Sequence, residues 1–316
     1  MTAHVHTNGS LPETLLLTRR ITTLSVATAA ILIVVKAAAW MASGSVALLA
    51  SLADSGLDLV ASLITFYAVR YAAVPPDAEH RFGHGKAEAF SSLVQGGLVF
   101  ASAALVGQEA ISHILSPEPV RAGGWALGVM GLSMVMTLAL IQAQTAVLRK
   151  TSSVAVSGDR AHYAADLAGN AAAIIGIAAA SFLKLPVLDA VAGLLVALWL
   201  LWGAIGVFRE ASRQLMDHEL PDEDRDRIKA LMLADPGVRD VHQLRTRASG
   251  PYIHIQMHAD LDPDLSLEAA HQIMVAAENR VLEAFPSADI IIHPDPRGRA
   301  EPHGGAFAEI NHEARQ

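Results

Sequence analysis

The sequence predicts an all-α bundle of six transmembrane helices followed by a small C-terminal α+β domain. Three observations lead to this fold class. The 316 residues are 52% hydrophobic and only 17% charged, with a mean hydropathy of +0.37. The apolar residues fall into six long runs, and after Met216 the composition becomes rich in Asp and Glu. Such values exclude an ordinary soluble protein and indicate a polytopic membrane protein.

The six apolar runs are each long enough to cross a bilayer, which needs roughly 20 residues for about 30 Å of hydrocarbon. They cover residues 20–43, 45–71, 86–114, 123–147, 154–182 and 187–210. Turn-forming residues such as Pro75-Pro76 separate them. We therefore divide the chain into a flexible tail (1–14), a six-span domain (15–213), an α+β domain (214–298) and a disordered tail (299–316).

The distribution of Lys and Arg predicts the orientation, because cytoplasmic loops carry more of them. With the N-terminus inside, the inner segments hold Arg19, Arg20, Arg70, Arg81, Lys86, Arg149, Lys150, Arg209 and Arg213. The outer loops hold only Arg121 and Lys184. We therefore expect both termini, and the α+β domain, to be cytoplasmic. The net charge is −8 and there is no basic stripe, so a nucleic-acid partner is not expected.

The α+β domain is predicted from its periodicity. The expected elements are a helix from Pro221, a strand at 238–246, a turn at Ala248-Ser249-Gly250, a strand at 252–260, a helix at 266–285 and a strand at 290–292. In the second strand Ile253, Ile255 and Met257 alternate with polar residues, which indicates one buried face. The order helix, strand, strand, helix, strand is typical of a small α+β domain.

Two carboxylates inside the second apolar run are the most unusual feature of the sequence. Asp54 and Asp58 are four residues apart and share one face of a helix. An aspartate at mid-bilayer depth costs at least ~2.5–3.5 kcal/mol, so the pair needs a cation, a partner charge or a water-filled cavity. The alternative is that the two aspartates cap or kink the helix near an interface, or form hydrogen bonds to neighbouring helices.

The fifth run offers a matching pair, His162 and Asp166, which are also four residues apart. Two facing helices with two such ligands each can form a tetrahedral cage of the kind that zinc prefers. The chain has no cysteine, so any metal site must use imidazole, carboxylate or carbonyl ligands. We therefore expect the second and fifth helices to be neighbours.

The loop between the second and third runs is a second candidate. Asp77, His80 and His84 have spacings that allow three ligands around one metal, and Gly83 and Gly85 allow a tight turn. A solvated polar loop is the alternative explanation.

The histidines of the α+β domain are scattered in the sequence. His242 lies on the first strand, His258 ends the second, His271 is on the second helix, and His293 and Asp295 follow the third strand. Asp295 could bridge two metals if the strand ends converge. Taken singly, each histidine is an ordinary polar residue, and His254 has no evident partner in the sequence.

Five motifs together resemble a known family. They are Ala53-Asp54-Ser55 with Asp58, the run Phe82-Gly83-His84-Gly85-Lys86-Ala87-Glu88, His162 with Asp166, Leu244-Arg245-Thr246-Arg247 with Ser249-Gly250, and Ile291-Ile292-His293-Pro294-Asp295-Pro296. They follow one another in order between about residues 15 and 298. The sequence is thereby similar to the cation diffusion facilitator family, close to its bacterial zinc and iron exporters.

The resemblance implies proton-coupled export of divalent metal, with Zn(II) both transported and bound at regulatory sites, and with protons as the counter-ion. It implies a homodimer in the lipid bilayer of a bacterial inner membrane, with a ferredoxin- or metallochaperone-like cytoplasmic domain. The residues that correspond to the transport site are Asp54, Asp58, His162 and Asp166, and those of the loop site are Asp77, His80 and His84. Those of a binuclear, dimer-stabilising cytoplasmic site are His242, His258, His271, His293 and Asp295, and Lys86 and Asp217 resemble an interdomain charge pair.

Other functions remain possible at this point. Fe(II), Co(II), Cd(II) or Mn(II) could replace zinc, because Asp and His ligands serve all of them. A metal-gated channel or sensor could use the same residues without protons. An intramembrane metalloenzyme would need an open coordination position and a general base, and the sequence has no His-Glu-x-x-His run.

Overall fold

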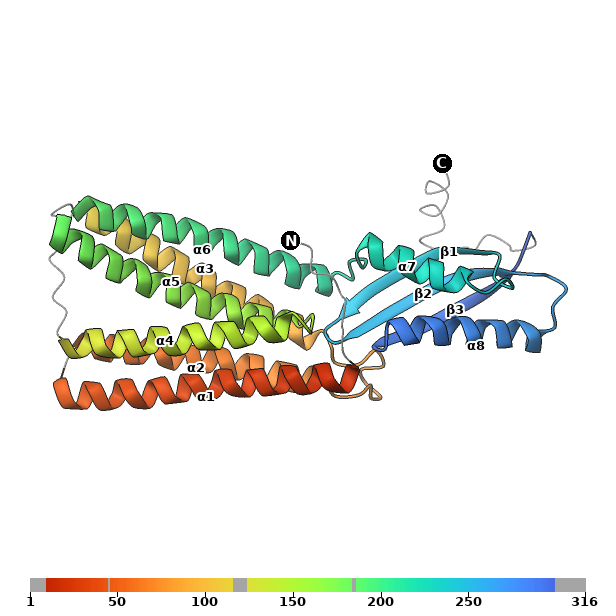
Figure 1. The fold of residues 1–316 in the computed structure, drawn as a ribbon, viewed down its shortest axis with the longest axis horizontal. Coiled ribbons are helices and arrows are strands. Elements are labelled where there is room, and N and C mark those ends of the chain that lie inside the picture. The colour runs from red at the N-terminus through yellow and green to blue at the C-terminus, as the bar shows by residue number, and fades with distance from the viewer. Residues whose placement is uncertain (1–9, 45, 116–123, 184–185, 299–316) are drawn as a thin grey trace.

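The computed structural model describes residues 10–44, 46–115, 124–183 and 186–298. Six long helices run side by side, and a smaller domain continues from one end of them (Figure 1). The helices are α1 (Leu11–Ser43), α2 (Val46–Ala72), α3 (Ala87–Leu115), α4 (Gly124–Leu148), α5 (Val154–Leu183) and α6 (Pro186–Leu215). Within the described residues, α1 to α4 and α6 are long and apolar enough to cross a membrane. The 30-residue α5 lies among them, which confirms the predicted bundle.

Helix α1 begins earlier than the sequence predicted. It starts at Leu11 with Pro12 in its first turn, where a missing N–H costs nothing. Residues 11–14 therefore belong to α1, and the prediction of a tail through residue 14 is wrong for them. The helix ends where Gly44 adopts φ +64° and donates its N–H to the Trp40 carbonyl at 2.7 Å. The rest of that tail (1–9) and the tail expected at 299–316 lie outside the described residues.

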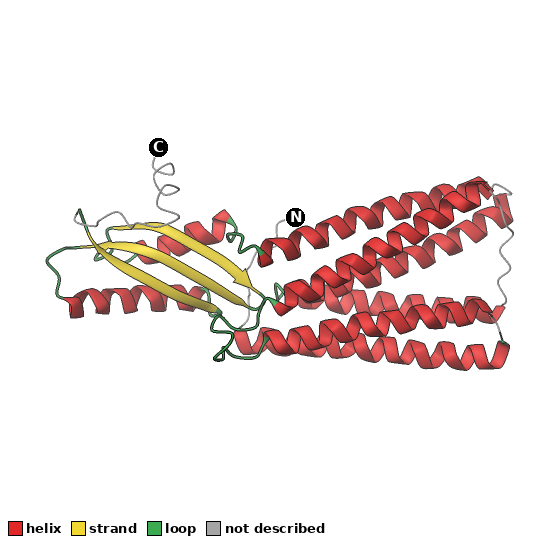
Figure 2. Ribbon diagram, turned by 180° about the vertical axis from the view of Figure 1, so that it is seen from behind, coloured by secondary structure: helices red, strands yellow, loops and turns green. Residues whose placement is uncertain are grey.

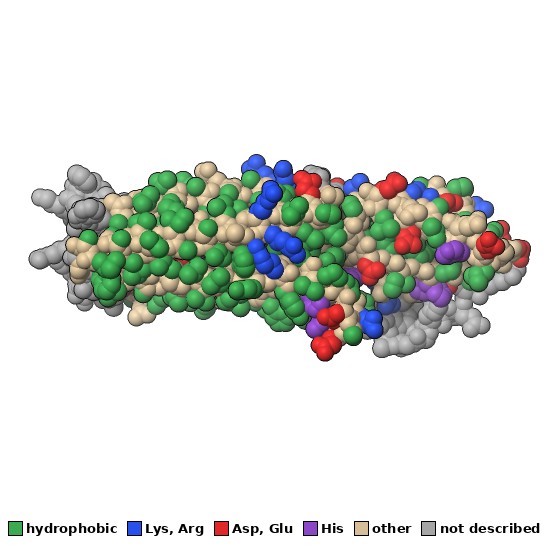
Figure 3. Space-filling model, turned by 90° about the horizontal axis from the view of Figure 1, so that it is seen from below, with side chains coloured by type: hydrophobic (Ala, Val, Ile, Leu, Met, Phe, Trp, Pro, Cys, Tyr) green, Lys and Arg blue, Asp and Glu red, His purple; other side chains and the backbone are tan. Residues whose placement is uncertain are grey.

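Apolar side chains cover the outside of the helical bundle, whereas charged side chains gather on the C-terminal domain and at its junction with the helices (Figure 3). Exposed residues on the bundle include Leu57, Leu105, Val135 and Trp202, each more than 60% exposed. Water would not favour such a surface, but a bilayer would. The exterior thus independently supports a membrane-embedded bundle.

Small residues let α3 and α6 pack closely along most of their length. A Cβ on Gly96 would lie 3.2 Å from Val207, and one on Gly193 would lie 3.2 Å from Ala110. Ala103 and Ala204 belong to the same buried cluster, in which Ala165 joins α5 to the pair. Close approach of this kind drives helix association where no hydrophobic effect operates.

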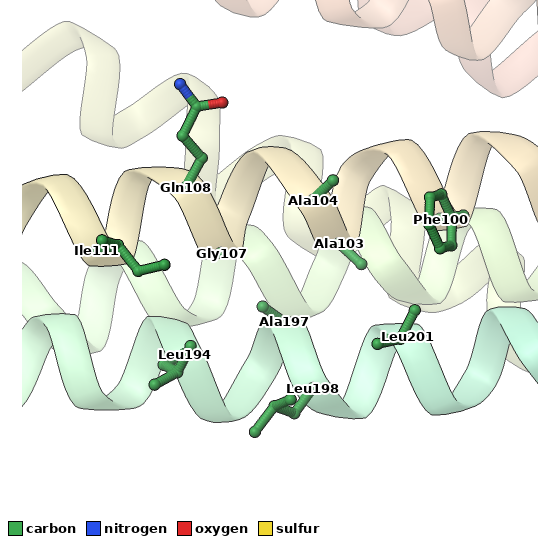
Figure 4. A pocket seen from close by; sticks show the side chains of 10 residues that line it. All are labelled: Phe100, Ala103, Ala104, Gly107, Gln108, Ile111, Leu194, Ala197, Leu198 and Leu201. Atoms are coloured by element: carbon green, nitrogen blue, oxygen red, sulfur yellow. The ribbon is translucent and has the colours of Figure 1, made fainter.

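An apolar pocket of about 500 Å³ lies between α3 and α6 (Figure 4). It is lined by Phe100, Ala103, Ala104, Gly107, Gln108, Ile111, Leu194, Ala197, Leu198 and Leu201. Gln108 is the polar member of this lining, and none of these residues can ligate a metal as an anion or imidazole. The pocket lining therefore lacks the carboxylate and imidazole ligands that the candidate metal sites use.

The C-terminal domain has the predicted order of elements, with a small sheet backed by two helices (Figure 2). They are α7 (Asp222–Leu233), β1 (Asp240–Ser249), β2 (Tyr252–Leu261), α8 (Leu267–Ala284) and β3 (Ala288–Pro296). Strand β2 is central, antiparallel to β1 and parallel to β3. Ile253, Ile255 and Met257 of β2 are at most 2% exposed and pack against both helices. The alternation predicted for the second strand is confirmed.

The turn between β1 and β2 differs from the prediction. Ala248 and Ser249 remain in β1, where they pair with Ile253 and Tyr252. Only Gly250, at φ +57°, adopts a backbone conformation that favours glycine. The predicted three-residue turn is therefore wrong at its first two positions, because the ladder continues up to the glycine.

The loop between α2 and α3 contacts this same turn. A Cβ on Gly85 would lie 1.9 Å from the Ser249 carbonyl oxygen, so the two backbones touch. Gly83, at φ +78°, serves a tight turn as predicted. Gly85 does not adopt a positive φ. A glycine is needed at this position because the loop backbone touches the C-terminal domain there. The bundle and the C-terminal domain are thus joined through backbone as well as side chains.

We predict that Gly85→Ala separates the loop from the β1–β2 turn, because the obstructing atom is backbone and cannot rotate away. Overpacking of this kind costs about 1–3 kcal/mol of the free energy of unfolding. Thermal unfolding of the purified protein and protease cleavage near the junction measure the effect. Gly97→Ala is the matched control, since a Cβ there meets nothing within 4 Å. Equal stability and cleavage in the two variants would refute the assignment.

Candidate metal sites

The structure brings three of the four predicted membrane ligands together. Atoms of Asp58, His162 and Asp166 that could ligate a metal all lie within 4.8 Å of one another. His162 Nε2 is 3.2 Å from Asp58 Oδ1 and 3.6 Å from Asp166 Oδ2. Asp58 and His162 are buried. Helices α2 and α5 are therefore neighbours, as the sequence predicted.

Tyr163 fixes the register between these two helices. Its side chain is 1% exposed, and its hydroxyl is 2.7 Å from the Ser62 Oγ on α2. Ser62 lies one turn after Asp58, and Tyr163 directly follows His162. The hydrogen bond thereby holds the carboxylate and the imidazole at the same height in the bundle.

Asp54 lies outside this three-residue cluster. Its side chain is exposed, one turn before Asp58 on α2. It interacts electrostatically with Asp58 and His162, so it belongs to the same neighbourhood. Its role as a fourth ligand stays a prediction.

Lys36 of α1 is a neighbour of the cluster that the sequence reasoning missed. Its Nζ donates to Ser55 Oγ at 2.6 Å and to the Ser51 carbonyl at 3.1 Å. The signal that would have found it is the one that identified the aspartates. A lysine within the apolar run of α1 needs a compensating partner just as they do.

Asp159 of α5 was also missed. This carboxylate is 1% exposed and accepts hydrogen bonds from Gln144 Nε2 at 2.8 Å and Gln95 Nε2 at 3.4 Å. Gln95 additionally donates to the Ala61 carbonyl at 2.9 Å. Asp159 thus joins α3, α4 and α5 less than one turn before His162. Buried hydrogen bonds between helices of this type favour one packing arrangement.

The three predicted loop residues also converge. Asp77, His80 and His84 have candidate ligand atoms within 4.8 Å of one another. The Asp77 carboxylate is 3.4 Å from His80 Nδ1 and 3.2 Å from His84 Nε2. The backbone N–H groups of His80 and Glu79 donate to Asp77. These bonds keep the pKa of Asp77 below its usual value, so the carboxylate is available as a ligand.

In the C-terminal domain, four of the five predicted residues meet at the ends of the strands. His258 pairs in register with His242 on β1 and with His293 on β3. Asp295 is buried, and its carboxylate is 2.9 Å from His258 Nδ1, 3.4 Å from His242 Nε2 and 3.3 Å from His293 Nε2. The strand ends therefore converge, which is the condition for Asp295 to bridge two metals, and the bridging role itself stays a prediction.

His271 is the member that the structure does not bring to this group. It is exposed on α8, while α8 packs its apolar stripe on the face of the sheet opposite the histidines. Its assignment as a ligand stays a prediction.

The interdomain charge pair is present. Lys86 Nζ is 2.9 Å from Asp217 Oδ1, and Arg247 Nη1 of β1 is 3.1 Å from Asp217 Oδ2. Partial burial opposes ionisation of Asp217, but the hydrogen bonds and charges of Lys86 and Arg247 outweigh it and hold its pKa below the usual value. Asp217, two residues after the end of α6, adopts φ +53°, a conformation that Asp tolerates.

His254 has partners, contrary to the expectation. Its Nδ1 is 3.2 Å from Asp289 Oδ2, and its ring meets Phe82 of the loop edge to face at 5.7 Å. The Arg247 guanidinium lies over the same Phe82 ring at 4.8 Å. The loop that carries the second candidate metal site is therefore anchored on β1 and β2 of the C-terminal domain.

Within the described residues, five helices are long and apolar enough to cross a membrane, and a cluster of carboxylate and imidazole groups lies between α2 and α5. The appended domain holds a second cluster, which contains histidines. This combination is typical of a membrane protein that handles metal cations. Comparison with known proteins identifies the class more closely. The family described as "Cation efflux transmembrane domain" matches residues 22–216. The family described as "Cation efflux protein, cytoplasmic domain" matches residues 220–297. The chain belongs to the cation efflux family.

Two bacterial relatives agree with this result. The cation-efflux pump FieF of Cronobacter sakazakii is 41% identical over 268 residues, which cover 85% of this chain and 89% of the relative. FieF of Klebsiella pneumoniae is 40% identical over 270 residues, covering 85% and 90%. A metal-bound C-terminal domain of the CzcD transporter from Thermotoga maritima is 29% identical, covers 25% of this chain and 93% of that structure, and has a TM-score of 0.24. The chain is a cation efflux transporter and not an enzyme, which confirms the resemblance and excludes the metalloenzyme.

We predict that the contact between the loop and the sheet weakens in acid. Burial keeps the pKa of His254 below 6.5, so folding favours the neutral ring. The stabilisation that comes from keeping the His254 ring neutral is complete above pH 6.5, the ordinary pKa of histidine. It is lost as the pH falls through the lowered pKa of the folded protein. Between pH 7.5 and 5.5, with chelator present, the melting temperature of the wild type therefore falls further than that of His254→Gln.

The exposed His218 supplies the control, because His218→Gln leaves the buried contact intact and keeps the wild-type pH dependence. Parallel slopes for the wild type and His254→Gln would show that the ring does not titrate with folding.

Proposed function

We propose that this transporter exports divalent metal cations, zinc foremost, from the cytoplasm in exchange for protons. The observation that carries the proposal is the cluster of Asp58, His162 and Asp166 inside the bundle. Ionisable residues within membrane helices mark ion pathways, and a compact set of imidazole and carboxylate ligands suits zinc. Asp54 completes a tetrahedral set from the preceding turn of α2.

Proton coupling follows from the chemistry of these ligands. A metal binds ionised carboxylates and neutral imidazole, so loading releases protons and unloading takes them up. In the inward-facing state the cluster loads metal from the cytoplasm, and rocking of the bundle exposes it to the outside, where protons displace the metal. His162 is the main coupling group, because histidine ordinarily titrates nearest to neutral pH.

The proposed orientation places both termini in the cytoplasm of a bacterium, with the bundle in its inner membrane. The chain enters α1 and leaves α6 at the end of the bundle that adjoins the C-terminal domain (Figure 1). Lysine and arginine collect at that end, as on the cytoplasmic side of membrane proteins.

The other two clusters regulate transport in this proposal and do not carry it. The loop site and the binuclear site of the C-terminal domain lie outside the apolar bundle, on parts that contact each other through Phe82 and His254. Zinc in the histidine cluster stabilises a homodimer. It shifts transport only to the extent that its affinity differs between the two conformations.

Two narrower alternatives concern the same residues. The first is that Fe(II), Co(II), Cd(II) or Mn(II) is the preferred ion, because the ligand types bind all of them. The second is a metal-gated channel or sensor, in which metal crosses without moving protons. A panel of ions assayed with a pH readout separates both from the proposal.

We predict that Asp58→Ala abolishes metal-dependent proton flux in proteoliposomes, because it removes the ligand that α2 contributes to the cluster and leaves His162 without its 3.2 Å partner. Metal entry and internal pH are recorded together for each divalent ion. Asp226→Ala, which removes an exposed carboxylate from α7, leaves the flux intact. Normal flux in Asp58→Ala would overturn the site assignment.

We also predict that His258→Ala reduces the dimer fraction or shifts the metal concentration at half-maximal flux, without abolishing flux. The residue lies between His242 and His293, so its loss opens the centre of the cluster. Mass measurement in detergent and flux titration report the two effects. Chelation of the wild type reproduces the loss of dimer. Complete loss of flux, or no change in either measurement, would contradict the regulatory role.

A further inference from the structure

Lys36 is a buried cation placed against the helix that carries Asp54 and Asp58. The side chain is 6% exposed and belongs to α1. Its ammonium donates to the Ser51 carbonyl and to Ser55 Oγ, at 3.1 and 2.6 Å. Ser55, which is 0% exposed, directly follows Asp54. The lysine therefore approaches α2 from the side of its ligand-bearing turn.

Electrostatic attraction connects this ammonium with three carboxylates of the transport region, Asp58, Asp54 and Asp166. Its hydrogen bonds, however, go to a serine and a backbone carbonyl. The ammonium is thus held close to the carboxylates by neutral groups and leaves their oxygens free for a metal ion. In the low-dielectric interior of the bundle, the charge of Lys36 acts on these carboxylates more strongly than it would in water.

The four proposed ligands and Lys36 add to a simple charge balance. The three ionised carboxylates Asp54, Asp58 and Asp166 and a neutral His162 carry −3, and Lys36 reduces this to −2. The nearby buried Asp159 is outside this count, because it is not a ligand and accepts hydrogen bonds from Gln144 and Gln95. One divalent cation then neutralises the ligands and Lys36 taken together, and a smaller net charge is less costly inside a bilayer. A singly charged ion leaves a negative charge uncompensated, and a triply charged ion leaves a positive one.

We propose that Lys36 is a fixed counter-charge that tunes the transport site to divalent cations and limits how tightly it holds them. This inference rests on the proposed transport site. The lysine repels a bound metal ion, so it weakens binding and speeds release on the outer side. A purely structural lysine, serving only to join α1 to Ser51 and Ser55, would act on stability and not on the charge of the ion.

The two roles are separated by how the effect scales with ionic charge. Repulsion between Lys36 and a cation is proportional to the charge of that cation. Removing the lysine therefore increases the logarithm of the binding constant about 1.5 times as much for a trivalent ion as for a divalent ion. A change of packing has no such dependence. Tb³⁺, used as an inhibitor of Zn²⁺ flux, is a suitable trivalent probe because it also binds carboxylate oxygens.

The experiment measures Zn²⁺ flux in proteoliposomes for the wild type, Lys36→Met, Lys36→Gln, Lys36→Arg and Ser55→Ala. In Lys36→Met and Lys36→Gln, we expect KM for Zn²⁺ to fall about tenfold, maximal flux to fall as release slows, and the inhibition constant of Tb³⁺ to fall roughly thirtyfold. Lys36→Arg and Ser55→Ala retain the charge and stay within about twofold of the wild type. Lys150→Met, which removes an exposed lysine at the end of α4, changes nothing.

The outcomes distinguish this inference from the proposed function. If the wild type shows no metal-dependent proton flux, or Asp58→Ala retains it, the transport site itself is wrong. If those two behave as expected, equal shifts for Zn²⁺ and Tb³⁺, or no shift in either charge-removing variant, overturn the role of Lys36. The role of Lys36 is also overturned if Lys36→Arg is as defective as Lys36→Met. It is overturned as well if Lys36→Met, Lys36→Gln and Lys36→Arg all fail to fold, because the lysine is then structural.

Discussion

A carboxylate between α2 and α5 would destabilise the bundle by several kcal/mol if no partner compensated it. This constraint explains several of the polar contacts between the helices. Asp58 faces His162, Asp159 accepts from two glutamines, and Lys36 lies against the turn that carries Asp54. Each of these polar contacts joins two helices and thereby favours one register between them. A cation bound in the cluster would neutralise the carboxylates, which the protein's own side chains otherwise do.

The junction between the bundle and the C-terminal domain is as specific as the interior of either part. Lys86 and Asp217 form an ion pair there, Gly85 touches the Ser249 backbone, and Phe82 lies between Arg247 and His254. All these contacts use the loop that also holds the second candidate metal site. The second candidate metal site and the C-terminal domain are therefore physically linked, because one short segment carries the candidate ligands and also makes these contacts.

Much of this architecture was predictable because it depends on periodicity. Apolar runs gave the helices, and four-residue spacing placed Asp58 opposite His162 and Asp166. Contacts between distant segments that leave no pattern in the sequence were not predictable. Neither the need for glycine at Gly85 nor the Asp289 partner of His254 leaves a local pattern, because each depends on another element arriving beside it. Lys36 stands out in the sequence as a charge within an apolar run. Its partner Ser55 is uncharged, so the sequence does not indicate that the two residues are in contact.

The two kinds of cluster differ in how they are held, and this bears on their roles. Backbone ladders fix His258 between His242 and His293, so the spacing of these ligands cannot change without breaking the sheet. The membrane cluster instead joins side chains of two separate helices, with the Tyr163 and Ser62 hydrogen bond as a link between them. Sliding or tilting of α2 against α5 would alter its geometry without breaking a backbone ladder. A site that must bind and release an ion in each cycle is therefore better placed between helices, and a site that must hold one is better placed on strands.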